Sequence, residues 1–380
     1  MAQAGSYAYV PIERVSWGAP AAQAAAAEAE RLDASRVMIV ASGTLSRKTD
    51  AIAEIKAALG ARFAGLFDEC REHTPLESVI ACTEAARAMK PDLILTVGGG
   101  TPIDTVKIVQ LCLAHDIRTV GDLLKIANKP NAASSPLRQI VVPTTLSGGE
   151  YSSFAGGMDK ARNTKDGYLG PDLCAQSVIL DPAITLHTPE WLWFSTAIRA
   201  VDHAVEGYCA PTTNAFVQAG ALHALKLFAI SLRRTKKDPA DLDARTRSQM
   251  AVWLAASGLG RVPMGASHGI GYVLGAVGGV PHGYTSCVML PAVLRWNEPA
   301  TSAQQRDIAA ALGMPEAPAW EAVALLLDDL GLPRRLADVG IQASQLPLIA
   351  ERALQSPVVK GNPRPVRAVE DVMEVLAFAS

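Results

Sequence analysis

The chain has 380 residues, of which 49% are hydrophobic, and its formal net charge is −2. That length allows a large core and two domains, while the dispersed, nearly neutral charge excludes the footprint of a nucleic-acid or anionic-membrane partner. The six cysteines include no C-x-x-C pair, and neither a secretory signal nor an uncharged apolar run of about 18 residues is apparent. We therefore expect a soluble, cytoplasmic protein with free thiols.

Short strand-forming runs alternate with helical segments in the first half of the chain. Runs rich in apolar residues predict strands at 36–42, 63–67, 92–97, 139–143 and 177–182. Helices are predicted at 21–27, 48–59, 76–89 and 103–114. The polar stretch "NKPNAASSP" at 128–136 predicts a surface loop. Buried strands separated by helices are typical of a parallel sheet in an α/β domain.

From about Thr188 the sequence becomes a series of alanine- and leucine-rich segments. Their apolar spacing predicts packed helices at 191–206, 216–234, 245–258, 270–275, 302–311 and 319–330. No segment here has a convincing strand pattern. We therefore predict an α/β domain over 1–184 and an all-helical domain over 185–380.

A glycine-rich turn follows the predicted strand at 92–97. In "TVGGGTPIDTVK" (96–107), three glycines join that strand to a helix. Glycine lets a phosphate approach the backbone, and a helix N-terminus offers unpaired N–H groups to it. The spacing matches neither G-x-G-x-x-G nor a P-loop. Phosphate binding and a simple tight turn are both compatible with this pattern.

A second loop, "VPTTLSGGEYSS" (142–153), ends the strand at 139–143 with hydroxyl side chains and glycines. Open α/β sheets bind ligands at the carboxyl ends of their strands. A polar turn is the plain alternative for this loop alone. Two such loops after neighbouring strands predict one shared ligand site.

Three histidines in the second half have the character of a metal-ligand set: His203 in "DHAVEGY", His268 in "GASHGIGY" and His282 in "VPHGYTS". Imidazoles from separate helices suit a divalent transition metal. Each is equally compatible with a hydrogen-bonded core histidine. Arg199 stands four residues before His203, so both side chains should share one helix face.

The ordered motifs resemble those of the iron-containing (group III) alcohol dehydrogenase superfamily. They are "GGGTPIDTVK", "PTTLSGGE", "VILDP", "DHAVEGY", "SHGIGYVLGA" and "VPHGYTSCVMLP", and the similarity runs from about Arg36 to Pro365. The resemblance implies a Rossmann-like dinucleotide-binding domain, a helical substrate and metal-site domain, and a cleft between them. It also implies cofactor contacts from Ser42, Gly98, Gly99, Gly100, Thr101, Asp104, Thr144, Thr145, Leu146 and Ser152.

The chain departs from that superfamily at the metal site. Metal-dependent members use three histidines, matched here by His203, His268 and His282, and an aspartate whose place Arg199 takes. Asp202 lies about 100° around the helix from His203, so we expect it to face elsewhere. A buried guanidinium repels a divalent cation. We expect function without iron or zinc; alternatively, Arg199 turns away into an ion pair, for instance with Asp202 or Glu206.

A tyrosine occupies a further position of interest. Many relatives have a histidine, a candidate for proton transfer, ten residues before the one matched by His282; here that residue is Tyr272. A phenol can also donate a proton or a hydrogen bond. Simple packing of Tyr272 is the alternative.

The short "PTTLSGGE" loop is similar to the maleylacetate reductase branch, although "DHAVE" differs from its usual pattern. That branch works without metal in aromatic catabolism, reducing the C=C bond of a dicarboxylated ring-cleavage product with NADH or NADPH. Arg199 could clamp a substrate carboxylate. We therefore expect a reductase of a small carboxylated enone or carbonyl compound. Arg199 and His203 would orient and polarise the substrate, and Tyr272 or His282 would supply the proton.

The cofactor preference and the rival functions stay open at this stage. Ser42 occupies the place of an aspartate that selects NAD, and Arg47 and Lys48 would attract a 2′-phosphate, so we expect NADPH to be accepted. The alternatives are a metal-dependent alcohol dehydrogenase using the three histidines, a lyase resembling dehydroquinate synthase, and a non-catalytic nucleotide binder. Apolar faces of the alanine-rich helices suggest a homodimer.

Overall fold

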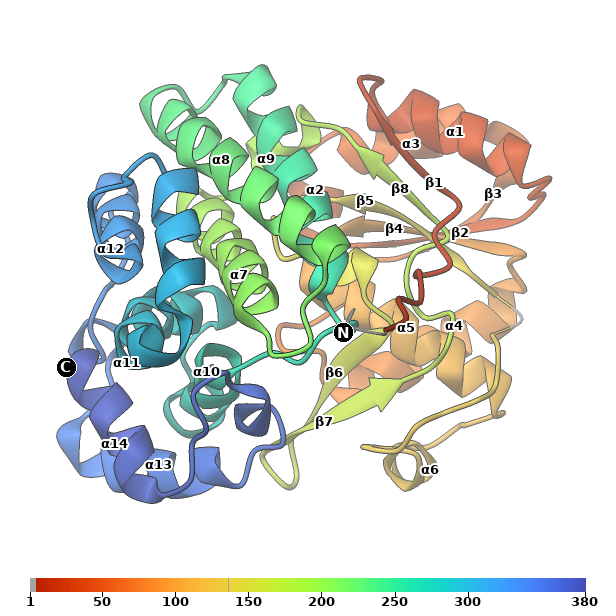
Figure 1. Ribbon diagram of the computed structural model, residues 1–380. Coiled ribbons are helices and arrows are strands. Elements are labelled where there is room, and N and C mark those ends of the chain that lie inside the picture. The colour runs from red at the N-terminus through yellow and green to blue at the C-terminus, as the bar shows by residue number, and fades with distance from the viewer. Residues whose placement is uncertain (1–4, 136) are drawn as a thin grey trace. The chain divides into compact units, whose positions relative to one another are not determined.

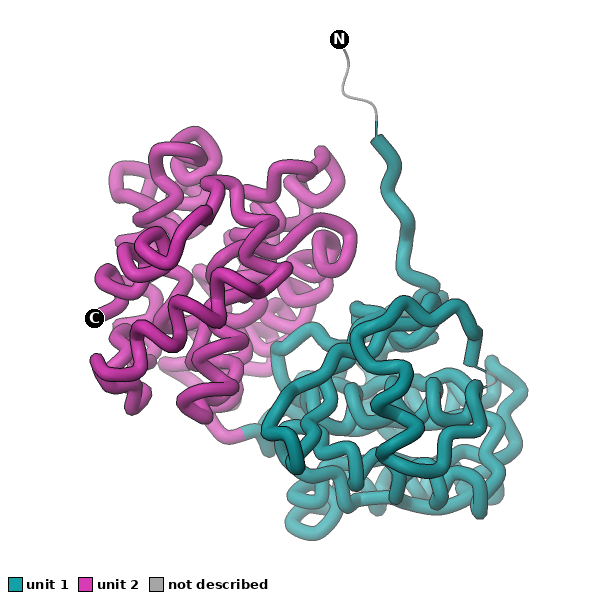
Figure 2. Tube along the Cα trace, turned by 90° about the horizontal axis from the view of Figure 1, so that it is seen from below, with its two compact units in different colours: residues 1–188 teal, residues 189–380 magenta. Residues whose placement is uncertain are grey.

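The computed structural model describes residues 5–135 and 137–380, so Pro136, the last residue of the predicted surface loop, lies outside the described residues. The chain divides into two compact units. The first ends at Thr188, and the second runs from Pro189 to Ser380 (Figure 2). The first unit is an α/β domain and the second is helical, as the sequence predicts.

A six-stranded parallel sheet forms the centre of the first unit. Its strand order is β1-β8-β5-β4-β2-β3. The bounds are β1 Arg14–Trp17, β2 Val37–Ala41, β3 Phe63–Phe67, β4 Leu93–Gly98, β5 Gln139–Pro143 and β8 Ser177–Leu180. All five predicted strands are present, and β1 is an additional edge strand. Since every pair is parallel, Gly98 at the end of β4 lies opposite Pro143 at the end of β5.

Helices cover both faces of this sheet (Figure 1). The helices of the first unit are α1 Ala21–Arg31, α2 Gly43–Lys48, α3 Ala51–Leu59, α4 Leu76–Met89, α5 Gly100–Ala114 and α6 Val120–Lys125. Helices α1 and α3 pack on one face, and α4 and α5 pack on the other. In α1 the buried residues Ala21, Ala25 and Ala29 repeat every four positions, which gives the helix a flat apolar stripe.

An antiparallel hairpin of β6 Phe154–Asp159 and β7 Thr164–Leu169 is not predicted by the sequence pattern. Glycines and charged residues interrupt the alternation by which strands are recognised. The turn is held by Arg162, which donates to both Asp159 and Asp166. Asn163 adopts a φ of 50° there. A local ion-pair cluster therefore stabilises this hairpin in place of an apolar pattern.

The second unit consists of helices. They are α7 Glu190–Cys209, α8 Ala215–Lys237, α9 Leu242–Ala255, α10 Ala266–Gly278, α11 His282–Ala311, α12 Ala319–Leu330, α13 Leu346–Leu354 and α14 Val369–Phe378. Each of the six predicted segments falls within or overlaps one of α7 to α12. Helix α11 is far longer than the predicted 302–311: it joins that segment to a preceding helix across a kink at Thr301, and Pro291 and Pro299 lie inside it.

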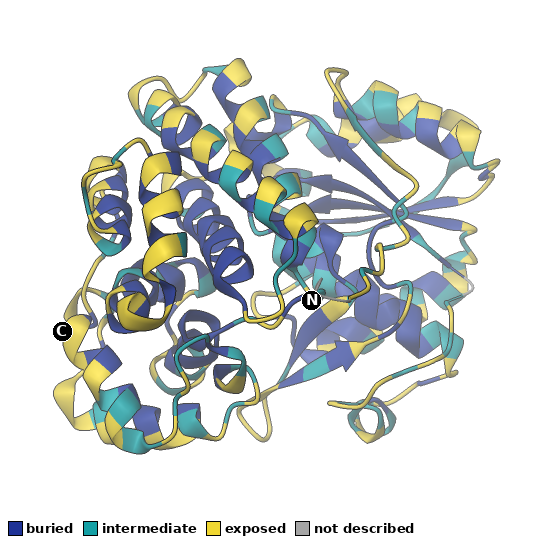
Figure 3. Ribbon diagram, in the orientation of Figure 1, coloured by how far each residue is buried: buried dark blue, intermediate teal, exposed yellow. Residues whose placement is uncertain are grey.

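Helix α7 is the most deeply buried helix of the second unit. Every residue from Trp193 to Cys209 is buried (Figure 3). A helix that is buried all round belongs in the middle of its domain. Polar side chains on α7 therefore need partners within the protein.

Helix α8 is long and apolar enough, by length and composition alone, to cross a membrane. Within that apolar stretch, 44% of the residues are buried inside the protein. The helix packs against α7 and α9. Core helices commonly have this composition.

Candidate active site

The predicted glycine turn joins β4 to α5 in a tightly enclosed backbone. Gly98 has a φ of 153°, and a Cβ atom there would lie 2.9 Å from Cγ of Pro102. At Gly99 a Cβ would lie 2.8 Å from Cγ2 of Thr145. Gly99 is also the N-cap of α5, which continues through Gly100 and Thr101. The turn therefore presents bare backbone and a helix N-terminus, which suits a pyrophosphate.

The second predicted loop lies directly beside this turn. The Thr144 N–H donates to the Gly98 carbonyl at 3.0 Å. The Thr188 hydroxyl donates to the Thr144 carbonyl at 2.7 Å. Thr145 and Leu146 are buried next to Thr144. Ser42, at the end of β2, lies 3.5 Å from the position of a Gly98 Cβ. The structure thus brings the predicted cofactor residues of three strands to one sheet edge.

Asp104 and Ser152, also predicted to contact the cofactor, bond to the hairpin strand β6. The Asp104 carboxylate accepts from the Gly156 N–H at 3.2 Å and lies 3.4 Å from Nζ of Lys107. Lys107, which the sequence analysis did not single out, is completely buried and donates to the Gly149 and Phe154 carbonyls. The Ser152 hydroxyl accepts from the Phe154 N–H at 3.1 Å. These contacts fix the shape of the loop.

In the second unit, Arg199, Asp202, His203 and Glu206 form one buried stripe of α7. Their spacing of i, i+3, i+4 and i+7 places them on one face of the helix. The prediction that Asp202 faces away from His203 is wrong, because Oδ2 of Asp202 lies 3.4 Å from Nδ1 of His268 and the His203 ring stacks on that same His268 ring. An apolar or functional face of a helix is at least about 100° wide, so neighbours in sequence can share it.

Glu206 holds the N-terminus of α10. Its carboxylate accepts from the Gly265 N–H at 2.7 Å, the Ser267 N–H at 2.8 Å and Nδ1 of His268 at 2.8 Å. Burial raises the pKa of Glu206 to about 7, against the backbone N–H groups, which lower it. From the sequence alone, Glu206 is predicted only as an ion-pair partner of Arg199. Its place in the stripe, three residues after His203, was the available signal.

His268 is a neutral hydrogen-bonding side chain in this cluster. Burial, together with the charge of Arg199, lowers the pKa of His268 to about 3. Its contact with Glu206 is therefore a hydrogen bond from Nδ1–H rather than an ion pair. This assigns the lone pair to Nε2, which has no hydrogen-bond partner within residues 5–135 and 137–380.

Arg199 is anchored at one end of its guanidinium. Nη1 donates to the Ser286 hydroxyl at 3.0 Å and lies 3.9 Å from Oδ2 of Asp202. Oδ2 also accepts from the hydroxyls of Ser286 at 2.7 Å and Ser267 at 2.8 Å. The guanidinium carbon lies 5.3 Å from the ring centre of Tyr272. The alternative of an ion pair between Arg199 and Asp202 thus matches the geometry, without turning Arg199 away from the histidines.

The three predicted histidines and Tyr272 form a row of rings. The His203 and His268 rings stack with centroids 4.9 Å apart. Tyr272 lies edge-on to His268 at 6.2 Å and to His282 at 6.1 Å. Burial, with a smaller contribution from the charge of Arg199, lowers the pKa of His203 well below its ordinary value. His282 therefore joins the row through Tyr272, which is 37% exposed.

The donor set does not fit a divalent cation well. Potential ligand atoms of Asp202, Glu206 and His268 lie within 4.8 Å of one another. The Glu206 oxygens, however, are occupied by three N–H groups. A guanidinium stands 3.9 Å from Asp202, where a second cation would be repelled. The contacts within this triad thus form a hydrogen-bonded network.

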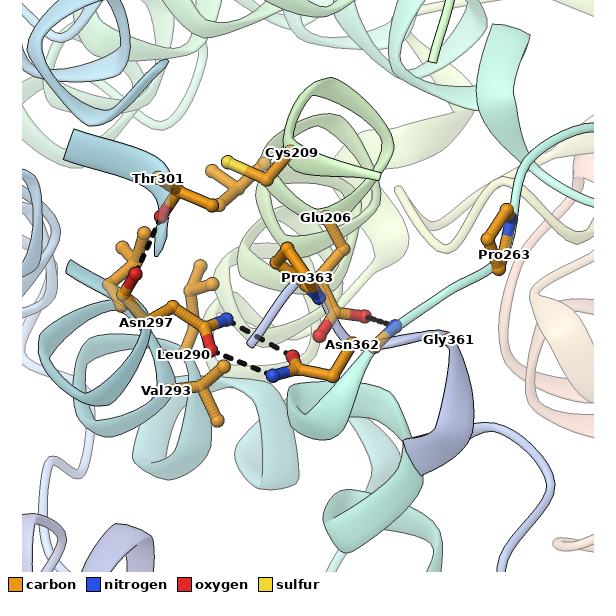
Figure 4. Close-up of a pocket in the computed structure, with 13 residues that line it drawn as sticks. Glu206, Cys209, Pro263, Leu290, Val293, Asn297, Thr301, Gly361, Asn362 and Pro363 are labelled. Carbon is orange, nitrogen blue, oxygen red and sulfur yellow. Dashed lines mark hydrogen bonds between the residues drawn. The ribbon is translucent and has the colours of Figure 1, made fainter. Parts of the chain in front are cut away.

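A small cavity lies behind Glu206, on the side of Asn297 and Asn362 (Figure 4). The two asparagine amides pair reciprocally at 3.0 and 2.7 Å. Asn362 also accepts from the Ala266 N–H at 3.1 Å, in the first turn of α10. The cavity volume is about 10 Å³, which suits about one water molecule. The asparagine pair therefore holds the first turn of α10, and the cavity beside it is too small for a substrate.

Comparison with known proteins matches this arrangement to one family. The iron-containing alcohol dehydrogenase model matches residues 13–182, and the C-terminal model of the same family matches residues 194–380. The chain is 32% identical to dehydrogenase FUM7 of Gibberella moniliformis, over 96% of each chain. It is 28% identical to maleylacetate reductase 1 of Rhodococcus opacus, over 93% of this chain and 90% of that one.

A solved structure shares the whole fold. The crystal structure of maleylacetate reductase from Agrobacterium tumefaciens superposes with a TM-score of 0.85 at 28% identity, covering 99% of this chain and 98% of that one. The family match covers both units, and the glycine turn, the second loop and the three histidines lie within the matched residues. The chain belongs to the iron-containing alcohol dehydrogenase family and is an oxidoreductase.

Proposed function

We propose that the protein is a metal-independent, NAD(P)H-dependent reductase of a small carboxylated enone or carbonyl compound, similar to a maleylacetate reductase. The observation that carries the proposal is Arg199. It stands where metal-dependent relatives are expected to have a ligand aspartate, and only its Nη1 is bonded to a described residue. The Nε and Nη2 groups make a free edge of the kind that grips a carboxylate in two parallel hydrogen bonds.

The first unit supplies the cofactor site in this proposal. Gly98 and Gly99 let the turn pack closely against Pro102 and Thr145, and the N-terminus of α5 that follows favours the negative charge of the pyrophosphate. Thr144 and Thr145 line the same edge from the next strand. When bound, the reduced nicotinamide supplies the hydride.

The second unit supplies the groups that hold and protonate the substrate. Arg199 binds a carboxylate and stabilises negative charge that develops on the conjugated oxygen. His203 is neutral, and its Nδ1 has no hydrogen-bond partner among the described residues. It is available to orient a polar substrate group. The proton comes from Tyr272, whose side chain reaches solvent and whose hydroxyl makes no hydrogen bond to the described residues, or from its neighbour His282.

The direct test is to measure turnover of maleylacetate with NADH and with NADPH. The reaction is monitored by the disappearance of the reduced nicotinamide. We expect reduction by the purified protein and slower reduction of an uncarboxylated enone of the same size. Cofactor binding without turnover of either compound would favour a non-catalytic nucleotide binder.

A metal-dependent alcohol dehydrogenase is the second candidate. It is favoured by one observation: His203 Nδ1 and His268 Nε2 are buried and, among the described residues, lack hydrogen-bond partners. Two such nitrogens could bind a metal. Metal analysis of the purified protein, with oxidation of simple alcohols as the assay, separates this candidate from the first.

We further propose that NADPH is accepted, that the enzyme is a cytoplasmic homodimer, and that its partners are small molecules rather than nucleic acids or membranes. Ser42 brings no carboxylate to the ribose site. Arg47 donates to Asp68 at 3.1 Å, so part of its charge is balanced, while Lys48 is exposed. A specificity for NADH a hundredfold above that for NADPH would contradict this reading of Ser42.

A further inference from the structure

We propose that Ser286 and Asp202 are positioning residues that hold the Arg199 guanidinium with its Nε–Nη2 edge free for a substrate carboxylate. The proposal rests on the proposed function and adds the residues that determine its specificity for carboxylated substrates. It concerns α7 and α11, the two helices that carry these three side chains.

The Ser286 hydroxyl links the cation to its counter-charge. It accepts from Nη1 of Arg199 at 3.0 Å and donates to Oδ2 of Asp202 at 2.7 Å. Arg199 and Asp202 are themselves 3.9 Å apart, which is beyond a good direct hydrogen bond. The serine therefore supplies the short contacts that the direct pair lacks.

Because these side chains are buried, the linkage fixes the orientation of the Arg199 guanidinium. Ser286 and Asp202 are fully enclosed, and Arg199 is 8% exposed. A charged group in such a place needs partners of good geometry. With Nη1 fixed by Ser286 and one face near the Tyr272 ring, rotation of the guanidinium would break the hydrogen bond. One orientation is thereby selected before any substrate binds, which reduces the entropic cost of binding.

The structure offers a matched control at Ser267. Its hydroxyl donates to the same Oδ2 of Asp202 at 2.8 Å, and the residue is also completely buried. Within the described residues it makes no hydrogen bond to Arg199. Removal of either hydroxyl takes one donor from Asp202, and only removal of Ser286 also releases Arg199.

The test compares Ser286→Ala with Ser267→Ala, using maleylacetate and its dimethyl ester as substrates. Because a hydrogen bond to a charged group is lost, we expect Ser286→Ala to raise KM for maleylacetate about tenfold, with KM for the nicotinamide cofactor unchanged. Its preference for the acid over the ester should fall. Ser267→Ala should affect both quantities less, and Ser286→Thr, which keeps a hydroxyl, should recover part of the preference. Equal effects of the two alanine variants would overturn the proposal.

A second measurement separates this proposal from the proposed function. Crystal structures of the wild-type protein and of Ser286→Ala report the position of Arg199 whether or not the protein turns over maleylacetate. We expect the guanidinium to leave its wild-type position in the variant. If the wild type does not reduce maleylacetate, the proposed function fails, and an unmoved Arg199 overturns the positioning role independently.

Discussion

Arg199 and Asp202 together decide the electrostatics of the ring row. Asp202 is a buried carboxylate one helical turn from a buried guanidinium, and two serine hydroxyls donate to it. An unpaired cation at this depth would be costly. The arrangement keeps the cation stable in the free protein while leaving one of its edges unused.

Replacement of Arg199 by lysine tests whether its two parallel N–H donors, and not only its positive charge, bind the substrate. Arg199→Lys keeps the positive charge and loses the planar pair of donors. We expect kcat/KM for maleylacetate to fall about thirtyfold, equivalent to about 2 kcal/mol of transition-state stabilisation. The control is Arg233→Lys, at an exposed site paired with Asp329. Equal kcat/KM values for Arg199→Lys and wild type would show that bidentate binding is not used.

Glu150 gives a prediction for stability against pH. Burial raises its pKa from 4.5 to about 7, while the charge of Lys107 lowers it. The folded state therefore binds this proton more tightly than the unfolded state. The stabilisation is complete below pH 4.5 and is lost as the pH rises through about 7.

Glu150→Gln removes this titration while keeping the size of the side chain. On raising the pH from below 4.5 to above 7, the variant should gain on the order of 3 kcal/mol of unfolding free energy relative to wild type. Chemical denaturation across that range measures the difference. A constant difference at every pH would contradict the buried, titrating carboxyl.

At the scale of elements, predictability follows the strength of local patterning. The continuous apolar run 139–143 and the periodic stretch 76–89 match β5 and α4 residue for residue. The hairpin β6–β7 was not predicted, because it is held by ion pairs and contains glycines where a strand pattern needs apolar residues. Most of α11 was not predicted, because prolines usually break helices. Here tertiary packing overrides that tendency at Pro291 and Pro299.

The same reasoning explains the site. Motif order was sufficient to place the glycine turn, the second loop and the three histidines. The two loops, His268 and His282 sit at strand ends and helix starts, whereas His203 lies inside α7 on its buried stripe. Asp202 was misplaced because the angle from His203 alone was considered, rather than the whole stripe through Arg199 and Glu206. Ser286 and Ser267 could not be found, because their contacts with Asp202 span 84 and 65 positions of sequence.

The junction of β4 and α5 offers an element-scale prediction. In Gly99→Ala the new Cβ would lie 2.8 Å from Cγ2 of Thr145, so the two loops proposed to bind the cofactor must separate. We expect the Kd for NADH to rise by about tenfold, as for about 1.4 kcal/mol of lost binding. Gly121→Ala in α6, where the nearest atom is 3.8 Å away, is the control. Fluorescence titration with NADH measures both, and unchanged binding in Gly99→Ala would remove this turn from the cofactor site.

At the scale of the whole molecule, the two units divide the work. The predicted cofactor residues all lie in the unit ending at Thr188, and the charged and aromatic cluster lies in the unit from Pro189 onward. In the second unit a family position expected to bind metal carries a cation of the protein itself. In the proposed function, this one side chain and the partners that hold it separate the protein from the metal-dependent members of its family.

The most direct test of the account is the rate of maleylacetate reduction after exhaustive chelation. The protein is treated with a strong chelator, shown by elemental analysis to be free of iron and zinc, and assayed with NADH and NADPH. If the proposed function is correct, the treated enzyme keeps its full rate, and added iron or zinc does not increase it. Loss of turnover on chelation, restored by either metal, would contradict it.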